Sequence, residues 1–154
     1  MNFRFLKRRT FWKIVWIAAL LFWCFFILSN SFQSGEKSGE SSTRVLKIVE
    51  TTVKKIDPEL SVTEKFVRKS AHFFEYFGLG ILLSLSPVFI KSRRTTLRHT
   101  LFVGLLFAMT DETVQLFSPG REGTLVDVWL DFSAVLLSSL LTFIIILYFQ
   151  KKSL

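Results

Sequence analysis

Three hydrophobic stretches of this chain carry ionisable or strongly polar residues at one end only. They are Lys69, His72 and Glu75 in the first stretch, Asp111, Glu112 and Gln115 in the second, and Asp127 and Asp131 in the third. If the chain crosses a membrane back and forth, all three ends come to the same side. A charged side chain inside a membrane-spanning helix costs about 2.5–3.5 kcal/mol on insertion scales, so such residues mark a functional site by default. The pattern predicts that something polar binds where the three ends meet.

The composition supports a membrane protein. Of the 154 residues, 50% are hydrophobic and 18 are Phe, which is too apolar for an ordinary small soluble domain. A helix needs about 20 largely apolar residues to cross about 30 Å of hydrocarbon. We therefore predict an all-α fold, in which one membrane domain over residues 1–154 packs four transmembrane helices as a small bundle. The predicted spans are 11–29, 71–90, 99–117 and 125–149.

The net charge of +8 is spread between the apolar runs and forms no single basic stripe, which argues against a nucleic-acid partner. Basic residues report orientation instead, because short cytoplasmic loops are rich in Lys and Arg. Eleven of them lie in segments without an acidic residue: Arg4, Lys7, Arg8, Arg9, Lys13, Lys91, Arg93, Arg94, Arg98, Lys151 and Lys152. This distribution predicts that both termini are cytoplasmic and that segments 30–70 and 118–123 lie outside.

The first apolar run has a second interpretation. Its basic start and its length also fit a cleaved signal peptide. The run ends in Leu28–Gln33 without a clear small-x-small cleavage site, so we favour an uncleaved span over a mature protein of three spans. Cys24, the only cysteine, lies inside this run and has no intramolecular disulfide partner. Its predicted role is core packing.

The long connection between the first two spans is predicted to contain one amphipathic helix. Ser34–Thr43 is polar and Ser-rich, which indicates a loop. Apolar residues then recur at helical spacing. They are Val45, Leu46, Val49, Val53 and Ile56. This helix either lies on the outer membrane surface or is a solvated linker. Asp57-Pro58 would end it, and the capping-box spacing of Ser61 and Glu64 predicts that the next helix begins near Val62.

Small and polar residues share one helical face in each of the last three spans. With 3.6 residues per turn, these faces are Lys69, His72, Tyr76, Gly80 and Ser84, then Gly104, Ala108, Asp111 and Gln115, then Asp127, Asp131, Ala134 and Ser138. Small residues let membrane helices approach closely, so the polar groups are expected on the packed face. Glu75 and Glu112 lie about a quarter-turn or more away and are predicted to border the pocket. The other halves of the spans carry no charge, which argues against a proton relay or a transporter.

The ordered combination of motifs resembles the VanZ-like membrane proteins, a family named for a protein associated with teicoplanin resistance. The motifs are Arg68–Tyr76, Asp111–Gln115, Pro119–Arg121, Asp127 and the exit of the first span, Leu28–Gly35. The resemblance covers nearly the whole chain. It implies a multi-pass protein of the bacterial plasma membrane and a contribution to glycopeptide resistance, without an established reaction.

Carried over by position, the family's characteristic polar residues are Lys69, His72, Glu75, Tyr76, Asp111, Glu112, Gln115, Arg121 and Asp127. The chain departs from the pattern at Asp131, where the family usually has Asn, and near Ala134 and Ser138, where it has glycines. The extra acid would alter what the pocket prefers.

The predicted pocket combines acids, bases and one histidine. The candidate acid, base or orienting residues are His72, Glu75, Asp111 and Glu112, and the candidate binding residues are Arg68, Lys69, Tyr76, Gln115, Arg121, Asp127 and Asp131. Either His72 and Glu75 cooperate in proton transfer, or the charges form a buried network that holds the helices together. We predict no cofactor. A divalent cation held by His72, Glu75, Asp111 and Asp127 is a less favoured alternative, because their spacing matches no dedicated metal motif.

The sequence is compatible with two functions from different classes. In the first, the pocket binds the anionic headgroup of an envelope lipid or of a lipid-linked wall intermediate, with or without modifying it. Arg68, Lys69 and Arg121 would contact the anion, since an arginine presents a planar fork suited to phosphate or carboxylate. In the second, the chain is a non-catalytic accessory membrane protein that binds a partner protein or the lipid tail of an antibiotic.

Overall fold

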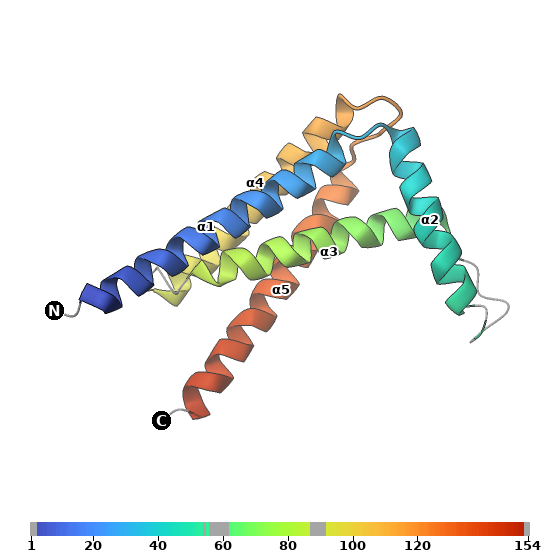
Figure 1. Cartoon of the computed structure of the whole chain (residues 1–154). Coiled ribbons are helices and arrows are strands. Elements are labelled where there is room, and N and C mark those ends of the chain that lie inside the picture. Colours follow the sequence, from blue (N-terminus) through green and yellow to red (C-terminus); the bar gives the residue numbers. More distant parts are fainter. Residues whose placement is uncertain (1–2, 54, 56–61, 87–91, 153–154) are drawn as a thin grey trace.

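The computed structural model describes residues 3–53, 55, 62–86 and 92–152. This part of the chain forms five α-helices and no strand, which confirms the all-α prediction. The helices are α1 Phe3–Ser31, α2 Gly35–Val53, α3 Glu64–Ser84, α4 Arg93–Leu116 and α5 Leu125–Lys152. Helices α1 and α4 run in one direction and α3 and α5 in the other, while α2 lies at an angle to the other four (Figure 1).

Among the described residues, two helical segments are long and apolar enough to cross a membrane. They are Thr10–Ser31, with a mean hydropathy of 2.2, and Leu125–Lys152, with 2.4. Both leave large apolar side chains exposed, such as Phe22 and Phe25 in α1 and Ile144 in α5. An apolar surface of this extent is typical of a face that contacts lipid.

The middle of the bundle is held together by small residues, as the sequence predicted. A side chain at Gly80 of α3 would collide with Ser138 Oγ and with the backbone of Val135 in α5. At Gly104 of α4, a Cβ would come within 2.6 Å of Val135 Cγ1. Ala108 and Val135 are fully buried beside them. Helices α3, α4 and α5 therefore meet through the predicted faces, and Cys24 of α1 packs against the same core, as expected.

The predicted loop at Ser34–Thr43 is wrong, because α2 already begins at Gly35. Ser34 caps this helix: its Oγ accepts a hydrogen bond from Lys37 N at 3.4 Å and its carbonyl accepts one from Ser38 N at 3.0 Å. Gly35 also donates its N–H to the carbonyl of Pro119, at 2.9 Å. These contacts outweigh the weak helix propensity of the Ser- and Gly-rich segment.

The predicted end of this helix at Asp57-Pro58 lies outside the described residues, as does the predicted capping residue Ser61. Helix α3 begins at Glu64, and its N-cap is Thr63, whose side chain accepts a hydrogen bond from Phe66 N at 3.2 Å. The start predicted near Val62 is therefore close to the observed one. The capping residue is Thr63, two residues after the predicted Ser61.

Candidate functional site

The polar parts of the helices come together at one end of the bundle, where α1 and α4 end and α2, α3 and α5 begin (Figure 1). We call this region the polar end. It contains a cavity of about 630 Å³. Eight of the predicted site residues line this cavity: Arg68, Lys69, His72, Glu112, Gln115, Arg121, Asp127 and Asp131. Polar residues predicted on α3, α4 and α5 thus line one shared cavity.

The other three predicted residues lie outside the lining of this cavity. Glu75 lines a neighbouring groove of about 440 Å³. Asp111 and Tyr76 are fully buried behind the cavity. The Tyr76 hydroxyl donates to the Phe107 carbonyl at 3.4 Å, which ties α3 to α4.

Arg121 joins four segments of the chain. One terminal nitrogen donates to the carbonyls of Asn30 and Ser31, at 3.2 and 3.3 Å. The other donates to Ser38 Oγ at 3.4 Å and lies 3.3 Å from Nε2 of His72. Burial, followed by the nearby charge of Arg68, lowers the pKa of Arg121 below its usual value, but a guanidinium remains charged in proteins. Arg121 therefore holds the end of α1, the start of α2 and α3 together.

The contact with Arg121 fixes the proton on His72. A guanidinium has donors and no acceptor, so Nε2 of His72 must accept and the ring proton must be on Nδ1. Nδ1 faces Glu75 Oε2 at 3.7 Å, which is longer than a hydrogen bond. The predicted pair of His72 and Glu75 is thus adjacent, and Arg121 occupies the nitrogen that would act as a base.

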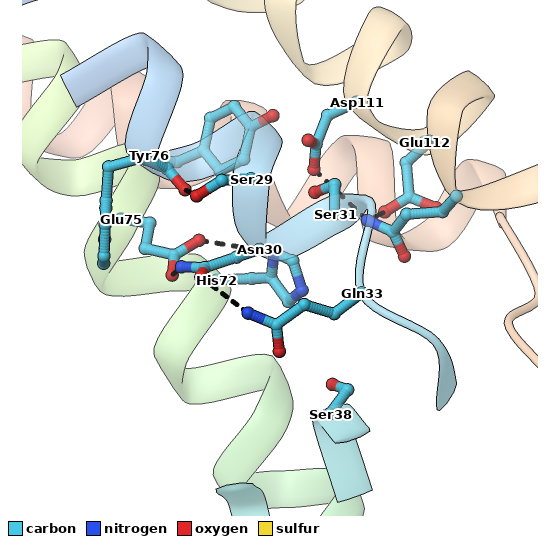
Figure 2. A network of polar contacts seen from close by, with 12 residues as sticks. Ser29, Asn30, Ser31, Gln33, Ser38, His72, Glu75, Tyr76, Asp111 and Glu112 are labelled. Carbon is cyan, nitrogen blue, oxygen red and sulfur yellow. Dashed lines mark hydrogen bonds and ion pairs between the residues drawn. The ribbon is translucent and has the colours of Figure 1, made fainter. Parts of the chain in front are cut away.

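Glu75 is held by the exit of α1 (Figure 2). Asn30 Nδ2 donates to Glu75 Oε1 at 2.7 Å, and Gln33 Nε2 donates to Asn30 Oδ1 at 3.3 Å. The indole N–H of Trp23 donates to the Glu75 carbonyl at 2.9 Å. The last turn of α1 therefore belongs to the site, although no residue of this turn was among the predicted site residues.

Gln115 and Glu112 organise the end of α4. The Gln115 amide donates to Asp111 Oδ2 at 3.2 Å and to Glu112 Oε1 at 3.0 Å. The other oxygen of Glu112 accepts from Thr124 N at 2.9 Å. Both carboxylate oxygens of Glu112 are thus engaged by the protein, and the residue positions the loop that leads into α5.

Lys69 and Asp127 form an ion pair between α3 and α5. The second oxygen of Asp127 accepts from Thr124 Oγ1 at 2.7 Å, and Asp127 N donates back to the same hydroxyl at 3.2 Å. Arg68 makes a surface ion pair with Glu64, at 3.7 Å. Such exposed pairs are worth about 0–1 kcal/mol, so Arg68 can exchange this partner for a ligand at little cost.

Further residues take part in the site without having been predicted as site residues, among them Asn30, Ser31, Ser38, Lys65 and Thr124. One signal was available in the sequence. The polar residues Ser29, Asn30 and Ser31 directly follow the apolar run of α1, and polar side chains next to a lipid-facing segment need partners within the protein. Ser31 also accepts from Ser118 Oγ through its carbonyl, at 2.9 Å. A backbone acceptor of this kind leaves no trace in the sequence.

Comparison with known proteins identifies one family model, described as VanZ/LLP1, which matches residues 15–147. Among curated proteins and solved structures, no match was found. The matched range extends from α1 to α5 and includes all residues that line the cavity. Together with the two long apolar helices, this match identifies a membrane protein.

Proposed function

Because the chain belongs to the VanZ/LLP1 family, we propose that it crosses the bacterial plasma membrane four times and binds an anionic amphiphile at its outer side. The cavity at the polar end takes the headgroup of an envelope lipid or of a lipid-linked wall intermediate. The family takes its name from a teicoplanin-resistance protein, so a contribution to resistance against this class of antibiotic is part of the proposal.

The alternating directions of α1, α3, α4 and α5 support four crossings (Figure 1). The helices α3 and α4 expose large apolar side chains along their length, among them Phe74, Phe102 and Met109. These side chains fit contact with acyl chains better than contact with water. The unaccompanied basic residues at both termini and around Arg94 support a cytoplasmic location for the end opposite the cavity.

The observation that carries the proposal is the row of cations on one wall of the cavity. Lys65, Arg68 and Lys69 line it from the first two turns of α3. Hydrogen bonds between a cation and a phosphate or carboxylate are about twice as strong as neutral ones. The cavity volume of about 630 Å³ is in the range of small-molecule sites. An anionic headgroup is the ligand that best matches this wall.

We assign Arg121 a structural role in the wall of the cavity. Its two terminal nitrogens contact the end of α1, Ser38 and His72, so this arginine builds the wall between cavity and groove. The engagement of His72 by Arg121 and of Glu112 by Gln115 and Thr124 favours binding over turnover. We therefore assign these groups to orienting the site.

The neighbouring groove supports an amphiphile as the ligand. Its apolar wall comes from α2 and α3: Val45, Val49, Phe66, Val67 and Phe74. The groove and the cavity share Arg68, His72 and Arg121, so the two spaces adjoin. A headgroup in the cavity and a hydrocarbon chain in the groove would occupy both.

The same groove favours a second candidate, an accessory protein that holds the lipid tail of an antibiotic. This candidate uses the apolar wall and does not need the cations. A Val45→Glu variant should then lose protection against teicoplanin in a susceptible host, whereas Arg68→Gln should retain it. Under the headgroup proposal, Arg68→Gln loses protection as well.

Lipid binding to the purified chain tests the proposal. Native mass spectrometry of the full chain titrated with phosphatidylglycerol should show at least about tenfold weaker binding to Arg68→Gln, because a charge-assisted hydrogen bond contributes about 1.5–3 kcal/mol. Arg94→Gln is the matched control, since it removes the same charge from the start of α4. Equal binding to the wild type and Arg68→Gln, or equal loss in the control, would contradict headgroup recognition.

A further inference from the structure

One carboxyl group at the polar end has no partner. Asp131 of α5 is only 1% exposed, and in the described residues neither of its side-chain oxygens has a hydrogen-bond partner. A buried ionised carboxylate without a partner costs several kcal/mol. Asp127, one turn earlier in the same helix, is paired with Lys69 and Thr124. The isolation of Asp131 therefore calls for a ligand that the polypeptide does not supply.

Two other side chains from different helices face the same point. One ligand atom each from His72 of α3, Asp111 of α4 and Asp131 of α5 lie within 4.8 Å of one another. Asp111 is fully buried, and its Oδ1 makes no hydrogen bond of good geometry in the described part of the chain, although the Ser31 side chain lies beside this carboxyl group. Three helices thus converge on one small space with two carboxylates and one imidazole.

Unpaired polar atoms concentrate in this region. Among the described residues, eight buried side-chain nitrogen or oxygen atoms lack a hydrogen-bond partner, and six of these belong to five residues of the polar end. The five residues are Ser31, His72, Glu75, Asp111 and Asp131. Four of these atoms face one another, because His72 lies beside Glu75 and Ser31 lies beside Asp111. Both oxygens of Asp131 remain without a partner in the described residues, and an unpaired buried carboxyl group of this kind points to a ligand.

We propose that Asp131, Asp111 and His72 bind a divalent cation. Two positive charges neutralise the two carboxylates, and one imidazole among oxygen ligands suits Zn²⁺ or Mn²⁺ better than Ca²⁺. Metal–ligand distances of about 2.0–2.6 Å allow a single ion to touch atoms that are 4–5 Å apart on its opposite sides. The spacing of the three residues therefore fits one ion.

The surrounding contacts resemble those that support metal ligands. Gln115 holds Oδ2 of Asp111 and leaves Oδ1 for the ion. Partners of this kind orient the ligands of a metal and typically contribute 10–100-fold to affinity.

The cation competes with Arg121 for His72. A neutral imidazole has one proton and one lone pair. If the ion takes Nε2, the lone pair is used, and if it takes Nδ1, Nε2 must carry the proton. In both cases no acceptor remains for the Arg121 donor, which now lies 3.3 Å from Nε2. Cation binding therefore releases one contact between the loop before α5 and α3.

Metal titration of the purified full chain tests this site without any lipid. After treatment with a chelator, isothermal titration with ZnCl₂ and, separately, MnCl₂ should show one ion per wild-type chain for at least one of the two metals. Asp131→Asn keeps the shape of the side chain and should reduce detectable binding by more than about 100-fold. Gln115→Leu removes the hydrogen bonds to Asp111 and Glu112 but none of the three proposed ligands, and it should weaken binding about 10–100-fold.

Glu122→Gln is the matched control, because Glu122 lines the same cavity but is exposed. This variant should bind the metal within about twofold of the wild type. If Asp131→Asn does not fold, Asp111→Asn provides the same comparison. The proposed site would be overturned if neither metal bound the wild type stoichiometrically, or if Asp131→Asn (or Asp111→Asn in its place) bound the metal as tightly as the wild type. Because the titration contains no lipid, its outcome is independent of headgroup binding.

Discussion

The two halves of the helix bundle are held together by different forces. At the polar end, helices are joined through side-chain hydrogen bonds and ion pairs, such as Lys69 with Asp127. In the middle and towards the opposite end, α3 and α5 meet at Gly80 and Val135 with almost no side chain between them. There, Ser138 and Ser139 donate to the carbonyl of Val135 in their own helix. Ser138 and Ser139 thus bond within α5 and leave its contact with α3 to shape.

This difference indicates that the close packing of small residues stabilises the bundle, whereas the polar end serves function. Close packing of small residues is the usual basis of helix association in lipid. A polar network in the same environment adds little net stability over an apolar one, because each group must first lose its water, although removing a single member leaves its buried partners unpaired. The polar end nevertheless contains most of the unpaired buried atoms in the described residues. Its residues are therefore better explained by a ligand than by packing.

The largest effect is expected for the residue on which the polar end depends most. Arg121→Ala would leave the carbonyls of Asn30 and Ser31 without one donor and free the start of α2. We expect the free energy of unfolding to fall by roughly 3 kcal/mol, which corresponds to a fall in Tm of roughly 6–12 °C for a chain of this size.

Thermal unfolding in detergent measures this change, with Arg94→Ala as the control for loss of one arginine. If Arg121→Ala melts like the wild type, the network at the polar end does not hold α1 and α2 in place.

A smaller loss of stability is expected for a substitution in the packed half, the part of the bundle where α3 and α5 meet at Gly80 and Val135. Gly80→Ala places a methyl group against Ser138 Oγ and the backbone of Val135, which cannot retreat without moving α5. Overpacking of this kind costs about 1–3 kcal/mol. Thermal unfolding again gives the measurement.

Gly39→Ala is the matched control for the glycine substitution. Its added methyl would meet only the end of the Glu64 side chain, at 3.3 Å, and a flexible side chain can move away. Equal melting of the Gly80 and Gly39 variants would show that close contact between α3 and α5 does not stabilise the packed half.

The smallest effect is expected for the ion pair of Lys69 and Asp127. Their side chains are 34% and 23% exposed, so the pair contributes about 1 kcal/mol or less. A double-mutant cycle with Lys69→Gln and Asp127→Asn measures the coupling between them. A coupling energy above about 2 kcal/mol would mean that the polar end is drier and more important for stability than we conclude.

The packed faces of the last three helices could be predicted from the sequence. Gly80, Ala108 and Ala134 fall on stripes with a period of 3.6 residues, and small residues have few other reasons to recur in apolar helices. The same stripes contain Asp111 and Gln115, so the meeting of the polar ends followed from periodicity. Local pattern was sufficient because each helix contributes its face independently.

Contacts that join distant segments could not be predicted. Asn30 binds Glu75 across 45 positions of the chain, and the start of α2 depends on the Pro119 carbonyl. The hydrogen bonds from Arg121 to the carbonyls of Asn30 and Ser31 could not be predicted either, because backbone acceptors have no sequence signature. Asp127 and Asp131 look alike in the sequence, although only the first meets a lysine.

The central claim is that the polar ends of α3, α4 and α5 line a cavity that opens on the outer face of the membrane. Single cysteines in a Cys24→Ser background, labelled in intact cells with a membrane-impermeant maleimide, test this most directly. Glu122→Cys at the cavity should be labelled in intact cells, and Arg94→Cys at the opposite end only after the membrane is permeabilised. Labelling in the reverse order would contradict the account.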